Sequence, residues 1–233
     1  MPEVSVYAVH KDNENVKQLA KKIGIESVKE KETGMLGFGM TSLLASRYED
    51  PEVKTFLFDL LKSDDLPNIR NKKNFAIGVV ERKKDKKATE AIIALMSNPK
   101  LKDTYTIQTA TLALGYLGGT DATRYLIKRY STEKDSINRS ELLGEIGLTQ
   151  TPLAREYLLK QLKTNNPTDN LYVFFGILDG FEYLGDKSTI SELRVFEDDR
   201  KLETDLKEMV EVKIERITKG IKMGPFTDFD RDF

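Results

Sequence analysis

One pattern recurs three times along the chain and limits what it can fold into. An apolar stretch ends in an aliphatic residue plus glycine, a short polar turn follows, and a second amphipathic stretch comes next. The copies occupy residues 110–130, 140–162 and 175–196. Their apolar residues recur at helical spacing. A pair of short helices cannot bury its apolar faces alone, so neighbouring pairs have to stack. The repeat therefore predicts an all-α chain of stacked helical hairpins.

The aliphatic–glycine pairs are Leu117-Gly118, Ile146-Gly147 and Leu184-Gly185. Glycine just after the last apolar residue suits a left-handed C-terminal cap, which residues with a β-carbon resist. All three glycines are therefore predicted to end a helix. Pro152 stands where the next helix should begin, a position that tolerates its missing N–H.

Two weaker units precede these copies, at residues 40–63 and 68–97, and both ends of the chain carry amphipathic segments. Asp12 is predicted to cap a first helix that Gly24 ends. Near the other end, an apolar stripe runs from Leu206 to Ile217 opposite a charged face. Terminal repeats need a polar outer face, so these segments are predicted to be capping helices. The alternation typical of a strand is sustained only at residues 3–9.

The motif A-x-x-A-L-G-x-L-G-x-x-x-A-x-x-x-L, matched best at residues 110–126, resembles HEAT repeats, particularly the short kind named for phycobilisome lyases. Residues 141–162 and 175–193 also match it, and residues before 100 match poorly. The resemblance implies an α-solenoid with an extended surface that docks proteins. We expect about five HEAT-like hairpins in one domain, 1–233. An N-terminal extension and capping helix would occupy 1–33, the repeats and C-terminal cap 34–218, and an aromatic–acidic tail 219–233.

Composition argues against several classes of function. Lys and Arg number 37 against 38 Asp and Glu, so the basic excess usual in nucleic-acid-binding proteins is missing. The chain has no cysteine, which excludes disulfides and thiolate metal sites. No apolar run reaches the length of about 18 residues that a membrane span needs. The N-terminus lacks the features of a signal peptide. We expect a cytoplasmic protein without membrane association; a periplasmic location remains open if a leader was removed.

Catalytic signatures are also weak. The only histidine is His10, and a histidine-based triad or metal site needs partners that hold the ring. Residues 34–41 come close to a phosphate-binding loop, but Met40 stands where lysine is required. The alternating acids Asp228, Asp230 and Asp232 end too soon to complete a calcium loop. We therefore expect no enzyme activity, no metal and no cofactor. A nucleic-acid-binding protein and a HEAT-type lyase-like enzyme are the alternatives.

A partner-binding surface is predicted on the second helices of the middle repeats. Aligning residues 122–130 with 154–162 places Lys128 over Lys160, with other cations close by. Further along, Glu192 and residues 197–199 are acidic, and this change of sign would orient an acidic segment of another protein. The aromatic-rich stretch 171–184 is interpreted as a buried helix or, alternatively, as an exposed interface anchor. The predicted partner-binding residues are Arg124, Lys128, Arg129, Arg155, Lys160 and Lys163.

Overall fold

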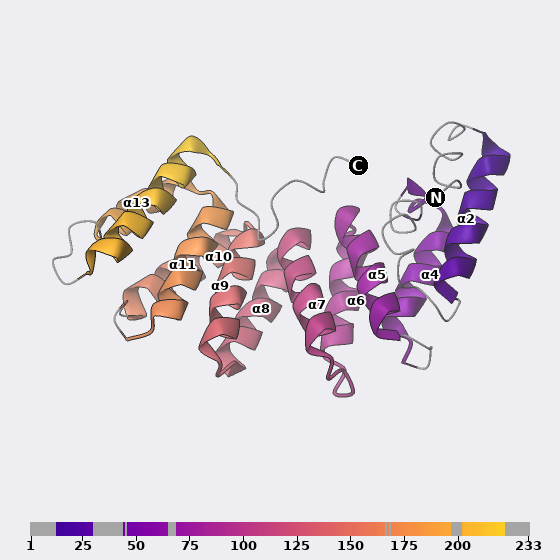
Figure 1. Cartoon of the computed structure of the whole chain (residues 1–233), viewed down its shortest axis with the longest axis horizontal. Coiled ribbons are helices and arrows are strands. Elements are labelled where there is room, and N and C mark those ends of the chain that lie inside the picture. The colour runs from indigo at the N-terminus through magenta and orange to yellow at the C-terminus, as the bar shows by residue number, and fades with distance from the viewer. Residues whose placement is uncertain are drawn as a thin grey trace. The chain divides into compact units, whose positions relative to one another are not determined.

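The structure is a computed structural model of the chain, and it describes residues 13–29, 44, 46–64, 69–165, 167, 169–196 and 202–221. All regular secondary structure in these ranges is helical. The helices, which Figure 1 labels, belong to two compact units, Met1–Ala113 and Leu114–Phe233. In each unit the helices pack mainly against neighbours in the chain, so the predicted all-α, solenoid-like fold is confirmed. The single domain over 1–233 stays a prediction.

The helices of the first unit pack in chain order. Helix α4 contacts α2 and α5, and α6 packs on both α4 and α5. The bounds are α2 Glu14–Lys29, α4 Pro51–Lys62, α5 Ile69–Arg82, α6 Lys86–Met96 and α7 Thr104–Leu117, the last continuing into the second unit.

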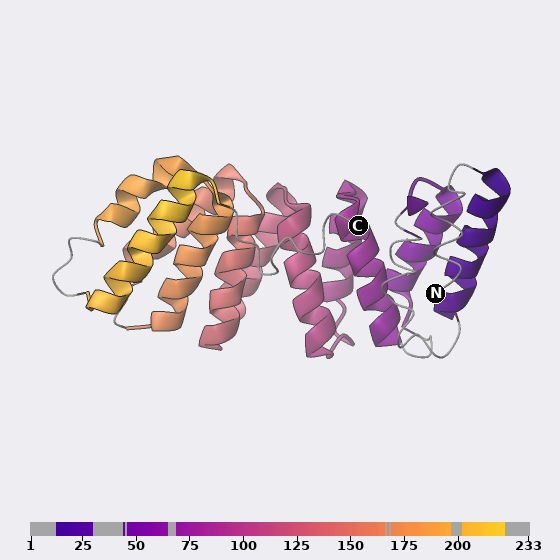
Figure 2. The same cartoon turned by 45° about the horizontal axis from the view of Figure 1, so that its top comes forward.

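The second unit repeats a two-layer arrangement. Helix α9 packs on α8, α10 and α11, and α13 closes the series against α11 and α12 (Figure 2). The bounds are α8 Thr120–Thr132, α9 Ser136–Leu148, α10 Pro152–Thr164, α11 Leu171–Leu184, the 3₁₀ turn η1 Lys187–Thr189, α12 Ile190–Arg194 and α13 Thr204–Lys219. The three predicted helix pairs thus correspond to α7–α8, α9–α10 and α11–α12.

Two of the three predicted glycine caps are confirmed, and the third is wrong. Gly118 and Gly185 have φ angles of +69° and +66°, as left-handed helix ends require. Gly147 instead lies inside α9, and Gln150 takes the left-handed position with φ +51°. The prediction that Gly24 ends the first helix is also wrong, because α2 continues to Lys29.

The glycines inside α9 and α11 let these two helices approach until their backbones touch. A β-carbon on Gly147 would lie 2.0 Å from the carbonyl oxygen of Gly180. A β-carbon on Gly176 would lie 2.5 Å from the carbonyl oxygen of Ser140. Atoms that are not bonded cannot approach so closely, so Gly147 is kept by packing between helices rather than by a cap.

Buried ion pairs attach the last helix to this unit. Glu182 on α11 is 1% exposed, and its carboxylate contacts Lys213 and Arg216 of α13, the latter at 3.3 Å. Lys213 also donates to Asp179 at 2.6 Å. The apolar stripe of α13 is buried against α11 and α12, apart from Met209, which is half-buried. The predicted C-terminal stripe is therefore confirmed.

A second contact recurs at the start of the second helices. In α4, α8 and α10, the fourth residue reaches the residue that caps the second helical segment of the following repeat. In the first unit Lys54 lies 3.6 Å from Asp85, the cap of α6. In the second unit Thr123 lies 2.9 Å from Thr151, the cap of α10. The next such contact joins Arg155 of α10 to the following repeat, at the predicted partner-binding surface.

Several sequence predictions lie outside the described residues: the Asp12 cap, the alternating residues 3–9, His10, the glycine-rich stretch 34–41 and residues 222–233 of the aromatic–acidic tail.

Candidate partner-binding surface

The six predicted cations lie on two helices of the second unit that contact each other, α8 and α10. Each helix contributes three of them. Their exposure differs, because helical spacing turns some toward neighbouring helices. Arg129 and Arg155 are half-buried, whereas Arg124, Lys128, Lys160 and Lys163 are exposed.

A recess of about 400 Å³ runs along α10. Half of the predicted cations line it: Arg155, Lys160 and Lys163. Leu159 supplies apolar surface between the charged groups, and Glu156 supplies a carboxylate. The recess therefore combines positive charge with a small apolar floor, which suits an acidic segment that also carries apolar side chains.

Arg155 has a structural role that the sequence interpretation missed. Its Nε donates to Asp186 at 3.0 Å, and its Nη2 lies 4.0 Å from Glu192. Asp186 caps η1, and the backbone N–H of Ser188 followed by Arg155 lowers the pKa of its carboxyl group. Arg155 thus links α10 to the next repeat, and this structural role is separate from any contact with a partner protein. A signal was present in the sequence: Asp186 directly follows the Leu184-Gly185 pair, in the polar turn of the third copy.

The lysines are less constrained than the arginines. Arg124 lies 3.6 Å from Asp121 of its own helix. Within the described part of the chain, no ion pair joins Lys128, Lys160 or Lys163 to a carboxylate. The three ammonium groups are therefore available to an incoming anion without the loss of an internal ion pair.

The sequence predicted that positive charge gives way to negative charge along this surface. Among the described residues, one acidic position of that prediction, Glu192, lies beside the recess. The pKa of Glu192 on α12 is lowered by the hydroxyl of Ser191 and, with a smaller effect, by Arg155 and Lys163. Glu192 is thus a carboxylate next to the cations of α10. Residues 197–199, the rest of the predicted acidic stretch, lie outside the described residues.

The aromatic helix α11 is mostly core, as the first interpretation held. Phe174 and Phe181 are buried, and Phe175 and Tyr183 are half-buried. Tyr172, in contrast, is 55% exposed. The interface alternative therefore applies only to the first turn of this helix.

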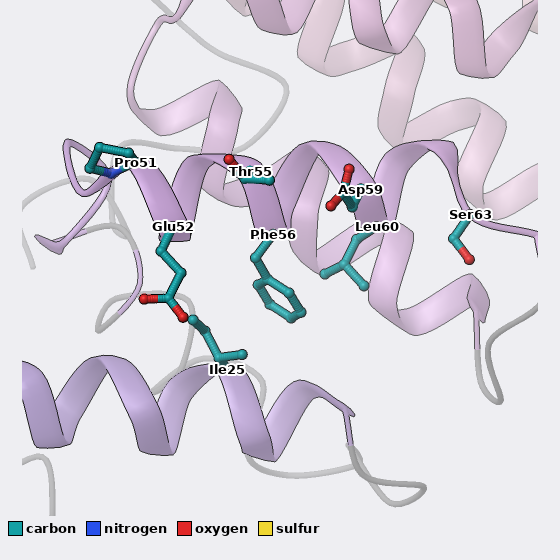
Figure 3. A pocket seen from close by; sticks show the side chains of 8 residues that line it. All are labelled: Ile25, Pro51, Glu52, Thr55, Phe56, Asp59, Leu60 and Ser63. Carbon is teal, nitrogen blue, oxygen red and sulfur yellow. The ribbon is translucent and has the colours of Figure 1, made fainter.

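The first unit has a larger recess, of about 740 Å³, between α2 and α4. Ile25 of α2 and Phe56 and Leu60 of α4 point into the space between the helices (Figure 3). Two carboxylates, Glu52 and Asp59, also line it. Glu52 lies 2.9 Å from Lys21, so one of the two is already ion-paired. The recess is a largely apolar groove.

Searches for a metal site and for a membrane span were negative within the described residues. No group of three or more His, Cys, Asp and Glu side chains could hold a metal ion there. None of the helices described is both long and apolar enough to cross a bilayer.

Comparison with models of known protein families and with curated proteins gave no match. The resemblance to HEAT repeats therefore stays an expectation based on the sequence motif.

Proposed function

We propose that this chain is a non-catalytic, HEAT-like scaffold that binds another protein through the basic surface of α8 and α10. The observation that carries the proposal is the recess along α10, which gathers Lys160 and Lys163 with apolar surface, while neither ammonium group makes an ion pair with a described residue. An acidic segment of a partner would gain charge-assisted contacts there without first displacing an internal carboxylate.

The partner-binding residues proposed are the six cations of the sequence interpretation, but their contributions should differ. Lys128, Lys160 and Lys163 are exposed and contact a partner directly. Arg155 is shared with Asp186, so its replacement would disturb the repeat as well as the surface. The test therefore uses Arg124, Lys128 and Lys160, whose reversal leaves the contact between Arg155 and Asp186 in place.

The experiment is affinity purification with the tagged full chain, followed by mass spectrometry. The test variant carries Arg124→Glu, Lys128→Glu and Lys160→Glu. The control carries Lys62→Glu, Lys87→Glu and Lys100→Glu, which changes the net charge equally at exposed positions of the first unit. We expect the control to retain the proteins captured by the wild type and the test variant to lose them, with unchanged thermal unfolding.

Capture of the same proteins by both variants would remove this surface from the proposal. A titration with DNA and RNA at low salt separates the main rival. Binding that weakens steeply as salt rises would instead favour a nucleic-acid partner.

A further inference from the structure

Three residues hold the same place in successive first helices of the second unit. Tyr116 of α7, Glu145 of α9 and Tyr183 of α11 each stand directly before an aliphatic–glycine pair. We call these three residues the Tyr–Glu–Tyr row. They lie on helices other than those of the basic surface, and all three are half-buried.

Glycines bring the members of the row close together. A β-carbon on Gly115 would lie 3.0 Å from the carbonyl oxygen of Glu145. A β-carbon on Gly144 would lie 3.1 Å from the Tyr183 ring. The Tyr183 ring therefore lies across α9 one residue away from Glu145, and the position before Tyr116 touches the backbone of Glu145 itself.

The carboxyl group at the centre of the row makes no ion pair within the part of the chain that the structure describes. Burial, and then the neighbouring Glu141, raise the pKa of Glu145 well above its ordinary value. Arg129 acts in the opposite direction, but no ion pair joins Glu145 to a cation within the described residues. A partly buried carboxyl without a counter-charge is unfavourable when ionised.

The two cations of α13 that face α11 already form ion pairs. Lys213 and Arg216 contact Glu182, and Lys213 also contacts Asp179. Burial, followed by Asp179 and Glu182, raises the pKa of Tyr183 to about 12, so this phenol is neutral at physiological pH. The row thus places tyrosine rings near a carboxyl that makes no ion pair within the described residues.

We propose that the Tyr–Glu–Tyr row binds the guanidinium group of an arginine side chain presented by a partner protein. A guanidinium is planar and weakly hydrated, so it can stack on a tyrosine ring while donating hydrogen bonds to a carboxylate. An ammonium is more strongly hydrated and lacks the flat face, which makes lysine the poorer ligand. Arginine also supplies the positive charge that Glu145 lacks.

This site goes beyond the basic surface and rests on the proposed function only in that the ligand belongs to a protein. The basic surface takes acidic groups, whereas the row takes a cation. Arg129 of the basic surface acts on Glu145, so the basic-surface variant is the one that leaves Arg129 unchanged.

The test uses the full chain and a short synthetic peptide of alternating glycine and arginine. The control peptide carries citrulline, which has nearly the same shape without the charge, in place of each arginine. Binding is followed by amide and aromatic NMR shifts. We expect the arginine peptide to shift signals from α9 and from the tyrosine rings, and the citrulline peptide to leave them unchanged. Equal binding of the two peptides would overturn the proposal.

Variants assign the contacts. Glu145→Gln should weaken binding about tenfold because a charge-assisted contact is lost, while Glu208→Gln, on the exposed face of α13, should not change it. Tyr183→Phe keeps the ring and should bind nearly as the wild type does, whereas Tyr183→Leu should bind several-fold more weakly. Unchanged binding by both Glu145→Gln and Tyr183→Leu would contradict the assignment.

The triple Glu variant of α8 and α10 should bind the arginine peptide at least as well as the wild type. Failure of the basic surface and failure of the row are therefore distinguishable.

Discussion

The helix pair α9–α11 of the second unit and the helix pair α2–α4 of the first are held together in different ways. At α9–α11, Gly147 meets Gly180 and the backbones touch. At α2–α4, a recess of about 740 Å³ lies between the helices, and side chains such as Ile25 and Phe56 line it. There Lys21 joins α2 to the start of α4 through Asp50 at 3.1 Å and Glu52 at 2.9 Å.

The difference concerns how tightly each contact specifies its geometry. Backbones in contact accept a single register, because any added atom must displace a helix. Ion pairs between partly exposed side chains tolerate sliding and are screened by salt. The second unit is therefore suited to present a surface of fixed geometry, whereas the α2–α4 contact specifies its geometry less tightly.

The largest effect is expected for Gly147→Ala. Its β-carbon would lie 2.0 Å from the carbonyl oxygen of Gly180, and backbone atoms on both helices leave no flexible side chain to move aside. We expect the free energy of unfolding to fall by about 3 kcal/mol or more. Chemical denaturation measures it.

Gly78→Ala is the matched control, since nothing lies within 4 Å of the β-carbon it would add in α5. We expect this change to stabilise the chain by about 0.5–1 kcal/mol through helix propensity. Similar effects of the two substitutions would show that the α9–α11 approach is not tight.

The second prediction compares the ion pairs of the two regions. Glu182→Gln removes a buried carboxylate that contacts Lys213 and Arg216, and should lower the free energy of unfolding by about 2 kcal/mol. The two cations are partly exposed and can turn toward water, which limits the loss.

Lys21→Met breaks the pairs with Asp50 and Glu52 at α2–α4. Since Glu52 is exposed, we expect a smaller loss than for Glu182→Gln, with a stronger dependence on salt. Denaturation at low and high salt measures both. A larger loss for Lys21→Met would reverse the comparison.

The third prediction concerns the α2–α4 recess itself. Phe56 lines it and is half-buried, so we expect Phe56→Ala to cost less than the loss of a fully buried side chain, about 1 kcal/mol of unfolding free energy. The neighbouring Leu57 is fully buried, and Leu57→Ala should cost about 3 kcal/mol. Equal losses measured by denaturation would mean that the recess is closed in solution.

Helix positions were predictable because they depend on local patterns, and the exceptions depended on distant residues. Pro152 and Gly185 mark helix ends by their own backbone preferences, and both predictions are confirmed. Gly147 was misread because a glycine after an apolar stretch suits either a cap or a close helix contact. What decides between them is Gly180, a residue of another helix.

The candidate surface likewise has features that local patterns predicted and one that depended on distant residues. Aligning two copies of the repeat was enough to predict that Lys128 and Lys160 lie on neighbouring second helices, and both are exposed. The pairing of Arg155 with Asp186 depends on how two repeats stack, which no spacing within one helix reveals. Whether the surface binds a partner stays a prediction.

The smallest effect is a change of stability with pH. It tests whether the close packing of α9 also makes the ionised form of Glu145 unfavourable. Glu145 lies beside Gly115 and Gly144, and burial raises the pKa of its carboxyl well above the ordinary 4.5. Between those two pKa values the folded chain binds more protons than the unfolded chain. The contribution of Glu145 to stability therefore falls as pH rises from 4.5, and levels off above the folded-state pKa. Glu145→Gln cannot ionise, so its stability relative to the wild type should rise over the same interval. Denaturation midpoints measured from pH 4 to pH 9 for both proteins decide this. A difference independent of pH would mean that Glu145 is solvated like a surface carboxylate.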